Sequence, residues 1–278
     1  DLVECMQDVY QETQRPFVIV IDEWDCIFRE YPHDTAAQKA YFDFLRDWLK
    51  DKEYVGLAYM TGILPIKKYG THSALNMFTE YSMENPRGLA PFVGFTEDEV
   101  KGLCEKYGMD FAECRAWYDG YRFTEAEHIY SPKSVVEAML AHRFDAYWNS
   151  TETYEALKVY IDLNEHGLRD AIVKMMAGAS IPIDTTTFQN DMTTFTSADD
   201  VMTLLVHLGY LGYDIDRGEV FIPNNEVRRE YVTATKHGEE WNIISHTLRA
   251  SDDLLAAVFE KDAAAVAAGV EKAHLETS

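Results

Sequence analysis

Two adjacent carboxylates come directly after a short apolar run near the beginning of the chain. The run Phe17–Ile21 consists of five apolar residues, most of them β-branched, and Asp22 and Glu23 follow at once. Open α/β sheets bind ligands at the carboxyl ends of their strands, which is where these side chains would lie. Asp22 would there bind Mg²⁺ through water, and Glu23 would polarise the water that attacks a γ-phosphate. The pattern predicts the Walker B strand of an ATPase; the alternative is that both carboxylates only cap or solvate a strand end.

A second strand is expected to bring a hydroxyl to the same place. The run Val55–Met60 has a strand pattern and ends at Thr61 and Gly62. Strand, helix and strand in this order predict a parallel crossover, which places the second strand beside the first. Thr61 would then lie near Asp22 and Glu23, where its hydroxyl would sense the γ-phosphate or orient water. A hydroxyl that merely caps the strand end is the alternative for Thr61.

Other charged residues could belong to the same site. Asp25 is predicted either to join the acidic mouth, and so take part in cofactor binding, or to be simply solvated. The polar stretch from residue 65 to 91 carries Lys67, Lys68 and Arg87 as candidate partners for phosphate, although basic residues of surface loops are usually just solvated. A stretch of this length with little periodicity is more often functional than idle.

The loop that cradles the phosphates in P-loop proteins is missing from this sequence. No G-x-x-x-x-G-K-[ST] motif occurs among the 278 residues, and only sixteen of them precede Phe17. The first residue is Asp1 rather than Met, and a helical pattern follows it. We therefore interpret the chain as a fragment whose phosphate-binding start lies outside it, and we expect the fragment alone not to hydrolyse ATP.

The hydrophobic pattern predicts the elements that position these residues. The strand Phe17–Ile21 is expected to be buried on both faces, as in a parallel sheet. Thr35 and Gln38 predict a capping box at the start of the amphipathic helix between the two strands. From residue 96 to 178 we expect a string of helices that pack through aromatic side chains. Their start signals are Thr96 with Glu99, Asp110 with Glu113, and Ser131 with Pro132.

The last third has the pattern of a winged helix. Ser197 would cap a helix that runs to Leu208, and strands at 210–215 and 219–222 would be joined by a turn at 216–218. This helix carries no Lys or Arg, so we expect it to pack against protein rather than bind duplex DNA. The predicted fold is therefore α/β followed by mainly α. Its parts are a partial P-loop ATPase core with the Walker B and sensor strands (1–95), a helical lid (96–190), a winged-helix-like segment (191–237) and carboxyl-terminal helices (238–278).

Composition limits the partners and the compartment. The formal net charge is −23, from 25 basic and 48 acidic residues spread along the chain, which disfavours broad nucleic-acid binding. Four cysteines without C-x-x-C spacing fit a reducing cytoplasm better than a zinc site or a disulfide framework. No apolar run approaches the roughly 18 residues that cross a bilayer, and no signal peptide is present. We therefore expect a cytoplasmic protein that does not enter a membrane.

A series of short motifs resembles the AAA-ATPase-like family of predicted bacterial ATPases. These proteins look related to STAND-type P-loop ATPases and commonly carry a PD-(D/E)XK nuclease-like domain at the carboxyl end. The usual Tyr after Asp-Glu is Trp24 here, and the nuclease-like domain is absent from this sequence. The matching motifs are Val-Ile-Asp-Glu-Trp-Asp (20–25), Met-Thr-Gly-Ile (60–63), Ser-Ala-Leu-Asn-Met-Phe (73–78), Gly-Phe-Thr-Glu-Asp-Glu-Val (94–100), Trp-Tyr-Asp-Gly-Tyr-Arg-Phe (117–123), Tyr-Ser-Pro-Lys-Ser-Val (130–135), Tyr-Trp-Asn-Ser-Thr (147–151) and Pro-Asn-Asn-Glu-Val-Arg (223–228).

The resemblance implies roles for the acidic residues. Asp22 corresponds to the Mg²⁺-directing acid, Glu23 to the water-activating one, and Thr61 to a sensor of the γ-phosphate, with ATP and Mg²⁺ as cofactors. It implies part of a nucleotide-dependent switch that controls a carboxyl-terminal effector domain or a partner protein. The alternative is a degenerate, non-hydrolysing module that binds protein or nucleic acid. A metal-dependent nuclease built on Asp22, Glu23 and Asp25 is less favoured, because no Asp…Glu-x-Lys set accompanies them.

Overall fold

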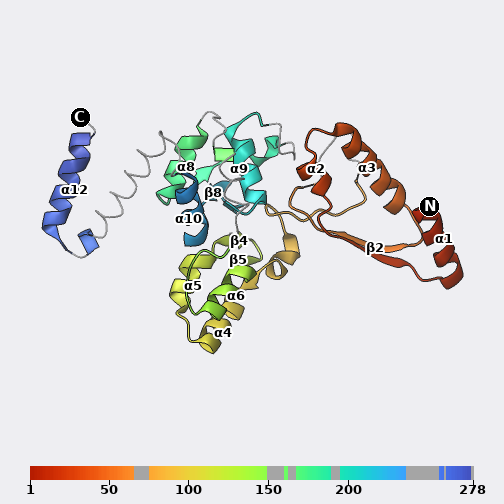
Figure 1. Ribbon diagram of the computed structural model, residues 1–278, viewed down its shortest axis with the longest axis horizontal. Coiled ribbons are helices and arrows are strands. Elements are labelled where there is room, and N and C mark those ends of the chain that lie inside the picture. The colour runs from red at the N-terminus through yellow and green to blue at the C-terminus, as the bar shows by residue number, and fades with distance from the viewer. Residues whose placement is uncertain are drawn as a thin grey trace. The chain divides into compact units, whose positions relative to one another are not determined.

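The computed structural model describes residues 1–65, 75–148, 160–161, 167–188, 195–235, 257–259 and 261–276. Helices and three small sheets make up these parts of the chain, so the predicted mixed α/β class is confirmed (Figure 1). None of the helices described is long and apolar enough to cross a membrane. The chain divides into two compact units, the first made of residues 1–93, 122–127 and 182–220 and the second of residues 94–121, 128–181 and 221–278.

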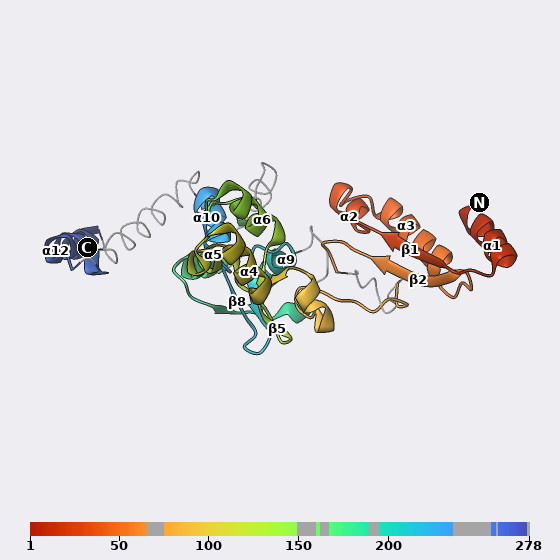
Figure 2. The same cartoon turned by 90° about the horizontal axis from the view of Figure 1, so that it is seen from below.

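The first unit contains the predicted strand–helix–strand arrangement. Strands β1 (Phe17–Ile21) and β2 (Val55–Met60) pair in parallel, as expected, with Ile21 opposite Met60. Helices α2 (Cys26–Glu30) and α3 (Thr35–Leu49) lie between them in sequence. In both views α3 runs alongside the strands (Figures 1 and 2). Helix α1 (Leu2–Thr13) precedes β1 and contacts α3, where Trp48 Nε1 donates to the sulfur of Met6 at 3.1 Å.

The two faces of this sheet differ in burial. Ile19 is buried, but its neighbours Val18 and Val20 are 69% and 68% exposed. Each pairs with an exposed residue of β2, Val18 with Leu57 and Val20 with Tyr59, so the four side chains form one apolar face. The prediction that β1 is buried on both faces is therefore wrong for the part of the chain described here. Side chains alternate along a strand, and the described elements cover only one of the two faces.

Helix α3 begins one residue earlier than the capping-box prediction implied. Its N-cap is Asp34, whose Oδ1 accepts from the amide of Ala37 at 2.9 Å. The side chain of Gln38 is buried and donates instead to the carbonyl oxygens of Tyr31 (2.9 Å) and Pro32 (3.1 Å). An Asp directly before the helix supplies a charged acceptor, which satisfies the free amides better than the Thr35 hydroxyl.

Between residues 94 and 141 the predicted helices are present, together with a sheet that was not predicted. The capping box of Thr96 and Glu99 is confirmed, as are the cap at Asp110 and the Ser131-Pro132 start. Short strands at β3 (Phe95–Thr96), β4 (Tyr121–Phe123) and β5 (Ala126–Tyr130) form a sheet in the order β3-β5-β4. The expectation of helices alone is thus wrong here. The helices are α4 (Glu97–Tyr107), α5 (Phe111–Tyr118) and α6 (Pro132–Ala141).

The aromatic residues of this segment form a core, as predicted. Tyr118 and Tyr130 are fully buried together with Val100, Cys114 and Val135 on the three helices and the neighbouring strand. Burial raises the pKa of both tyrosines and of the Cys114 thiol. These groups stay protonated and serve packing rather than chemistry.

The last third has one helix followed by a hairpin. Ser197 caps α9 (Ala198–His207) through the amide of Asp200 at 3.2 Å, as predicted. The hairpin strands β7 (Gly212–Asp214) and β8 (Glu219–Phe221) are shorter than expected, and Gly218 provides the left-handed turn with φ +64°. A third strand, β6, extends the sheet in the order β6-β8-β7. The remaining elements with bounds not yet given are η1 (Arg87–Phe92), which precedes β3, and α8 (Leu168–Met176), β6 (Ile181–Pro182), η2 (Thr185–Thr187), α10 (Asn225–Ala234) and α12 (Ala263–Glu276).

Candidate functional site

The carboxyl ends of β1 and β2 bring three of the predicted site residues together. Asp22 and Glu23 follow β1, and Thr61 follows β2, which pairs with β1 in parallel. The backbone continues the pairing past the strands: the Thr61 amide donates to Ile21 O, and the Trp24 amide donates to Thr61 O, each at 2.9 Å. The two strand ends are therefore joined into one rigid turn region.

Asp22 is exposed and is oriented by two donors. The Glu23 amide donates to Asp22 Oδ1 at 3.0 Å, and the Thr61 hydroxyl donates to the same oxygen in a short hydrogen bond. Asp22 Oδ2 makes no hydrogen bond with the residues that the structure describes, and the residue as a whole is exposed. A carboxylate and a hydroxyl are hard oxygen donors that suit Mg²⁺, which usually takes one or two carboxylates and completes its shell with water and phosphate.

The donor set is too small for a metal held by protein alone. No group of three or more His, Cys, Asp or Glu side chains within the described ranges is placed to hold an ion. The oxygens of Asp22 and Thr61 are of the kind that Mg²⁺ takes when water and phosphate supply its other ligands.

Glu23 has an unusual backbone conformation. Its φ is +53°, in the left-handed region that few non-glycine residues adopt. Such a conformation costs on the order of 1–3 kcal/mol and persists only where the surroundings enforce it. The Glu23 side chain is 55% exposed and accepts a hydrogen bond from Arg29 Nη2 on α2. The Glu23 carboxylate is thus largely exposed and is oriented by its hydrogen bond with Arg29.

Asp25 is buried, so the solvated alternative is wrong for this residue. Its exposed fraction is 0%, and its Oδ2 accepts from the amides of Ile63 (3.1 Å) and Leu64 (2.8 Å). Arg29 Nε lies 3.3 Å from the same oxygen as an ion-pair partner. The two amides bind Asp25 to the loop after β2, and Arg29 joins it to α2, so the residue supports the turn region from within. A role in cofactor binding stays a prediction.

The side chain of Trp24, which follows Glu23, is part of the hydrophobic core next to the site. Its ring is buried in tilted contact with Phe28 (5.5 Å between centroids) and Phe42 (6.1 Å). A side chain at Gly62 would come within 2.6 Å of both Trp24 Cδ1 and Asp25 Oδ1. Glycine is therefore required at this position by close approach.

The other predicted candidates lie elsewhere. Lys67 and Lys68 fall outside the described residues. Arg87 is stacked over the Tyr81 ring, with its guanidinium carbon 5.6 Å from the ring centroid. The residue that sequence reasoning missed is Arg29, whose only signal is its spacing of four from Asp25 at the start of a helix.

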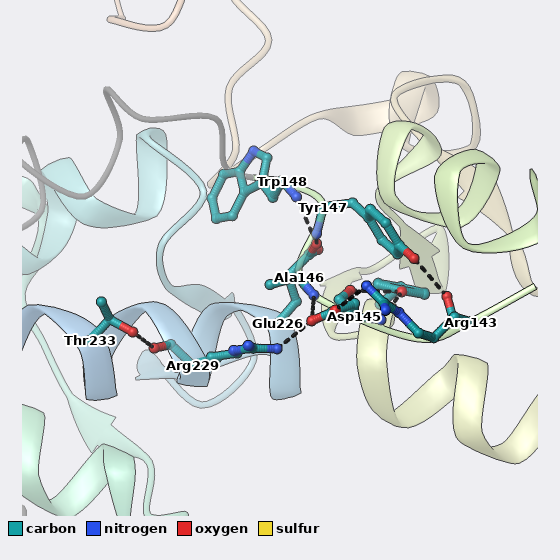
Figure 3. A network of polar contacts seen from close by, with 9 residues as sticks. Arg143, Asp145, Ala146, Tyr147, Trp148, Glu226, Arg229 and Thr233 are labelled. Carbon is teal, nitrogen blue, oxygen red and sulfur yellow. Dashed lines mark hydrogen bonds and ion pairs between the residues drawn. The ribbon is translucent and has the colours of Figure 1, made fainter. Parts of the chain in front are cut away.

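A second polar network joins several of the motifs quoted above. Glu226 Oε1 accepts from the amides of Tyr147 (2.6 Å) and Trp148 (2.8 Å), and Arg229 donates to Asp145 (Figure 3). Glu226 is buried, and burial raises the pKa of its carboxyl group. The network fixes the segment after α6 onto the first turn of α10.

Close backbone approach adds another motif to this network. Gly120 has φ +125°, and a side chain on it would come within 2.1 Å of Pro223 O. The preceding residue, Asp119, is paired with His128 Nδ1 at 2.7 Å and with Arg115 Nε at 3.5 Å. Gly120 of the motif at 117–123 thus meets the motif at 223–228, which also holds residues 147 and 148. The contacts are backbone packing and hydrogen bonds that hold these segments together.

Comparison with known proteins supports a family for the first part of the chain. Residues 1–71 match the sequence model of the AAA-ATPase-like family, described as "Predicted AAA-ATPase". A relative, "Uncharacterized protein in vnfD 5'region" of Azotobacter chroococcum mcd 1, is 28% identical over 142 residues. The aligned part is 49% of this chain and 27% of the relative, so the chain spans about a quarter of that protein's length. No solved structure matches the chain.

Proposed function

We propose that Asp22, Glu23 and Thr61 are the metal- and water-directing part of an ATP-hydrolysing site of the P-loop class. The observation that carries the proposal is the hydrogen bond from the Thr61 hydroxyl to Asp22 Oδ1, made across the ends of two parallel strands. The match of residues 1–71 to a predicted ATPase family supports the same assignment.

Each residue has a definite task in this proposal. Mg²⁺ bound with ATP would neutralise charge on the phosphate oxygens, and Asp22 would hold its hydration shell through Oδ2. Thr61 and the Glu23 amide fix the direction of the Asp22 carboxylate by occupying Oδ1. Glu23, which is exposed, would accept a hydrogen bond from the attacking water and orient it toward the γ-phosphate.

The hydrolytic site would serve a switch. The state of the nucleotide would be passed to a carboxyl-terminal effector domain or a partner protein in the bacterial cytoplasm. The free thiols of Cys5 and Cys26, both exposed, suit a reducing compartment. Duplex DNA is not the expected partner of α9, because this helix carries Asp199 and Asp200 in its first turn and has no Lys or Arg. A duplex titration at low salt that gave submicromolar binding would contradict this view.

Substitution of the two acids in the full-length protein tests the hydrolytic site. Glu23→Gln keeps the size of the side chain but removes the charge, so nucleotide should still bind while steady-state hydrolysis falls by about 100-fold or more. Asp22→Asn should instead weaken Mg²⁺-dependent binding of nucleotide. Phosphate release measures turnover, and a fluorescent ATP analogue titrated with and without Mg²⁺ measures binding.

The matched control is Glu30→Gln, which removes one exposed carboxylate from the end of α2. It should leave both hydrolysis and binding unchanged. If Glu23→Gln and Asp22→Asn hydrolyse ATP as fast as the wild type, the assignment of these residues is wrong.

A further inference from the structure

Within the part of the chain that the structure describes, Arg29 is the one cation that contacts two acids of the candidate site. From α2 its Nη2 donates to Glu23 Oε2, while its Nε lies 3.3 Å from Asp25 Oδ2. Its side chain is 26% exposed, and its two partners differ sharply, since Glu23 is 55% exposed and Asp25 is fully buried. Arg29 therefore connects a carboxylate that faces solvent with one that lies inside the protein.

The buried end of this connection is fixed by the loop after β2. Asp25 Oδ2 takes the amides of Ile63 and Leu64 in addition to Arg29, and Asp25 Oδ1 is packed against Gly62 without a hydrogen-bond partner. A buried carboxylate is tolerated only when donors compensate for its lost hydration. Asp25 thus has one position, and that position depends on the loop that also carries Thr61.

At the exposed end, Glu23 accepts a single side-chain hydrogen bond from the residues that the structure describes. Glu23 is in the left-handed conformation, and the hydrogen bond from Arg29 is the side-chain contact that directs its carboxylate. A guanidinium is planar and presents several N–H donors in fixed directions, so one Arg can hold two carboxylates at a set separation. A Lys has a single ammonium group on a flexible stem and cannot do this equally well.

We propose that Arg29 is a positioning residue for Glu23, set in place by Asp25 and, through Asp25, by the loop that carries Thr61. This inference rests on the proposed ATP-hydrolysing site. Under it, the residue that orients the attacking water is linked to the loop that carries Thr61 by a hydrogen bond from Arg29, the ion pair of Arg29 with Asp25, and the hydrogen bonds of Asp25 with Ile63 and Leu64. A change of the Thr61 loop on nucleotide binding is then transmitted to Glu23 through Asp25 and Arg29.

The test is a double-mutant cycle in the full-length protein. Arg29→Met should lower kcat for ATP by about 10- to 100-fold, since a displacement of about 1 Å at a reacting group has effects of this size. The KM for ATP should stay within about twofold, because under this proposal Arg29 acts on Glu23 and not on the nucleotide. Arg29→Lys should give an intermediate kcat. The control is Arg46→Met on α3, which removes an Arg paired with Asp43 away from the site and should leave kcat unchanged.

The double variant Glu23→Gln/Arg29→Met separates positioning from a general structural role. If Arg29 acts through Glu23, the residual rate of the double variant equals that of Glu23→Gln alone. A further drop in the double variant, or a wild-type kcat in Arg29→Met, overturns the proposal. Should Arg29→Met fail to fold, Arg29→Lys decides, and a wild-type kcat in that variant also overturns it.

The proposed function can fail separately. If the wild type does not hydrolyse ATP, or if Glu23→Gln is as active as the wild type, the ATPase assignment falls and the role of Arg29 falls with it. If Glu23→Gln is inactive and Arg29→Met is fully active, only the role of Arg29 is wrong.

Discussion

Gly62 shows how tightly the residues of the candidate site are packed. A methyl group at this position would lie 2.6 Å from Asp25 Oδ1 and 2.6 Å from Trp24 Cδ1, and both of these neighbours are buried. Asp25 cannot move aside without breaking its hydrogen bonds with the loop after β2, and the Trp24 ring is packed against Phe28 and Phe42. Asp25 and Trp24 can therefore pack this closely only because residue 62 has no side chain.

Gly62→Ala should lower the free energy of unfolding by about 1–3 kcal/mol, the usual cost of inserting a methyl group into a packed region. Urea unfolding followed by Trp fluorescence measures the change, and the buried Trp24 reports on the site directly. Gly88→Ala is the control, since a side chain at Gly88 meets nothing within 4 Å. Equal stability of the two variants would contradict the packing described here.

His207 is the residue for which burial has the clearest effect on acid stability. It lies at the end of α9 against the ring of Phe188, and burial lowers its pKa from 6.5 to about 4. The unfolded chain therefore takes up a proton near pH 6.5, whereas the folded chain does so only near pH 4. Stability present above pH 6.5 is lost as the pH falls between these values. At about 1.4 kcal/mol per pKa unit the loss is on the order of 3 kcal/mol.

His207→Gln should remove this part of the pH dependence. The difference in unfolding free energy between wild type and variant, measured in urea, should shrink as the pH is lowered from 7 to 4.5. His33→Gln, at an exposed position, should keep the wild-type slope. A parallel pH dependence of His207→Gln and wild type would show that this histidine does not titrate as described.

At the scale of elements, Glu226 is the residue that attaches the segment after α6 to α10. Glu226→Ala leaves the amides of Tyr147 and Trp148 without their acceptor, which should cost about 2–3 kcal/mol. Glu226→Gln keeps an acceptor oxygen and should cost less. Burial raises the pKa of this carboxyl group, so the stability that it contributes is present below its ordinary pKa and lost as the pH rises through the raised value.

The advantage of wild type over Glu226→Gln should accordingly be larger at pH 4 than at pH 7. Urea unfolding gives the stabilities, and hydrogen exchange at the Tyr147 and Trp148 amides shows whether the segment is released. Glu105→Ala, an exposed position on α4, is the control. Unchanged exchange at both amides in Glu226→Ala would show that the segment is held by other contacts.

The elements of the candidate site were largely predictable, and their burial was not. The apolar run before Asp22 and the strand before Thr61 are strong local patterns, and the parallel crossover follows from chain order. Which face of β1 is covered depends on elements distant in sequence, so Val18 and Val20 were misassigned. The strands β3 and β4 are two and three residues long, too short for a period to be visible.

Single contacts were the hardest to predict from the sequence. Asp34 and Thr35 are both good caps, and only the helix start decides between them. The burial of Asp25 depends on the position of the loop after β2. Its hydrogen-bond partners there, Ile63 and Leu64, are 38 and 39 residues away in the sequence. Local sequence patterns cannot predict a contact between residues so far apart in the sequence. The hydrogen bond between Glu226 and the Tyr147 amide joins residues 79 positions apart and could not be predicted for the same reason.

For the whole molecule, the apolar face of Val18, Val20, Leu57 and Tyr59 has a consequence for colloidal behaviour. Copies of this chain carry a net charge of −23, so at low ionic strength their mutual repulsion keeps these faces apart. Salt shortens the range of that repulsion from about 10 Å at 0.1 M to about 3 Å at 1 M, while the attraction between apolar surfaces remains. Light scattering should therefore rise with NaCl concentration, and Val20→Lys should suppress the rise. Leu140→Lys, which changes an exposed apolar residue on α6, should not. Salt, rather than loss of the fold, would then set the concentration at which this protein stays dispersed.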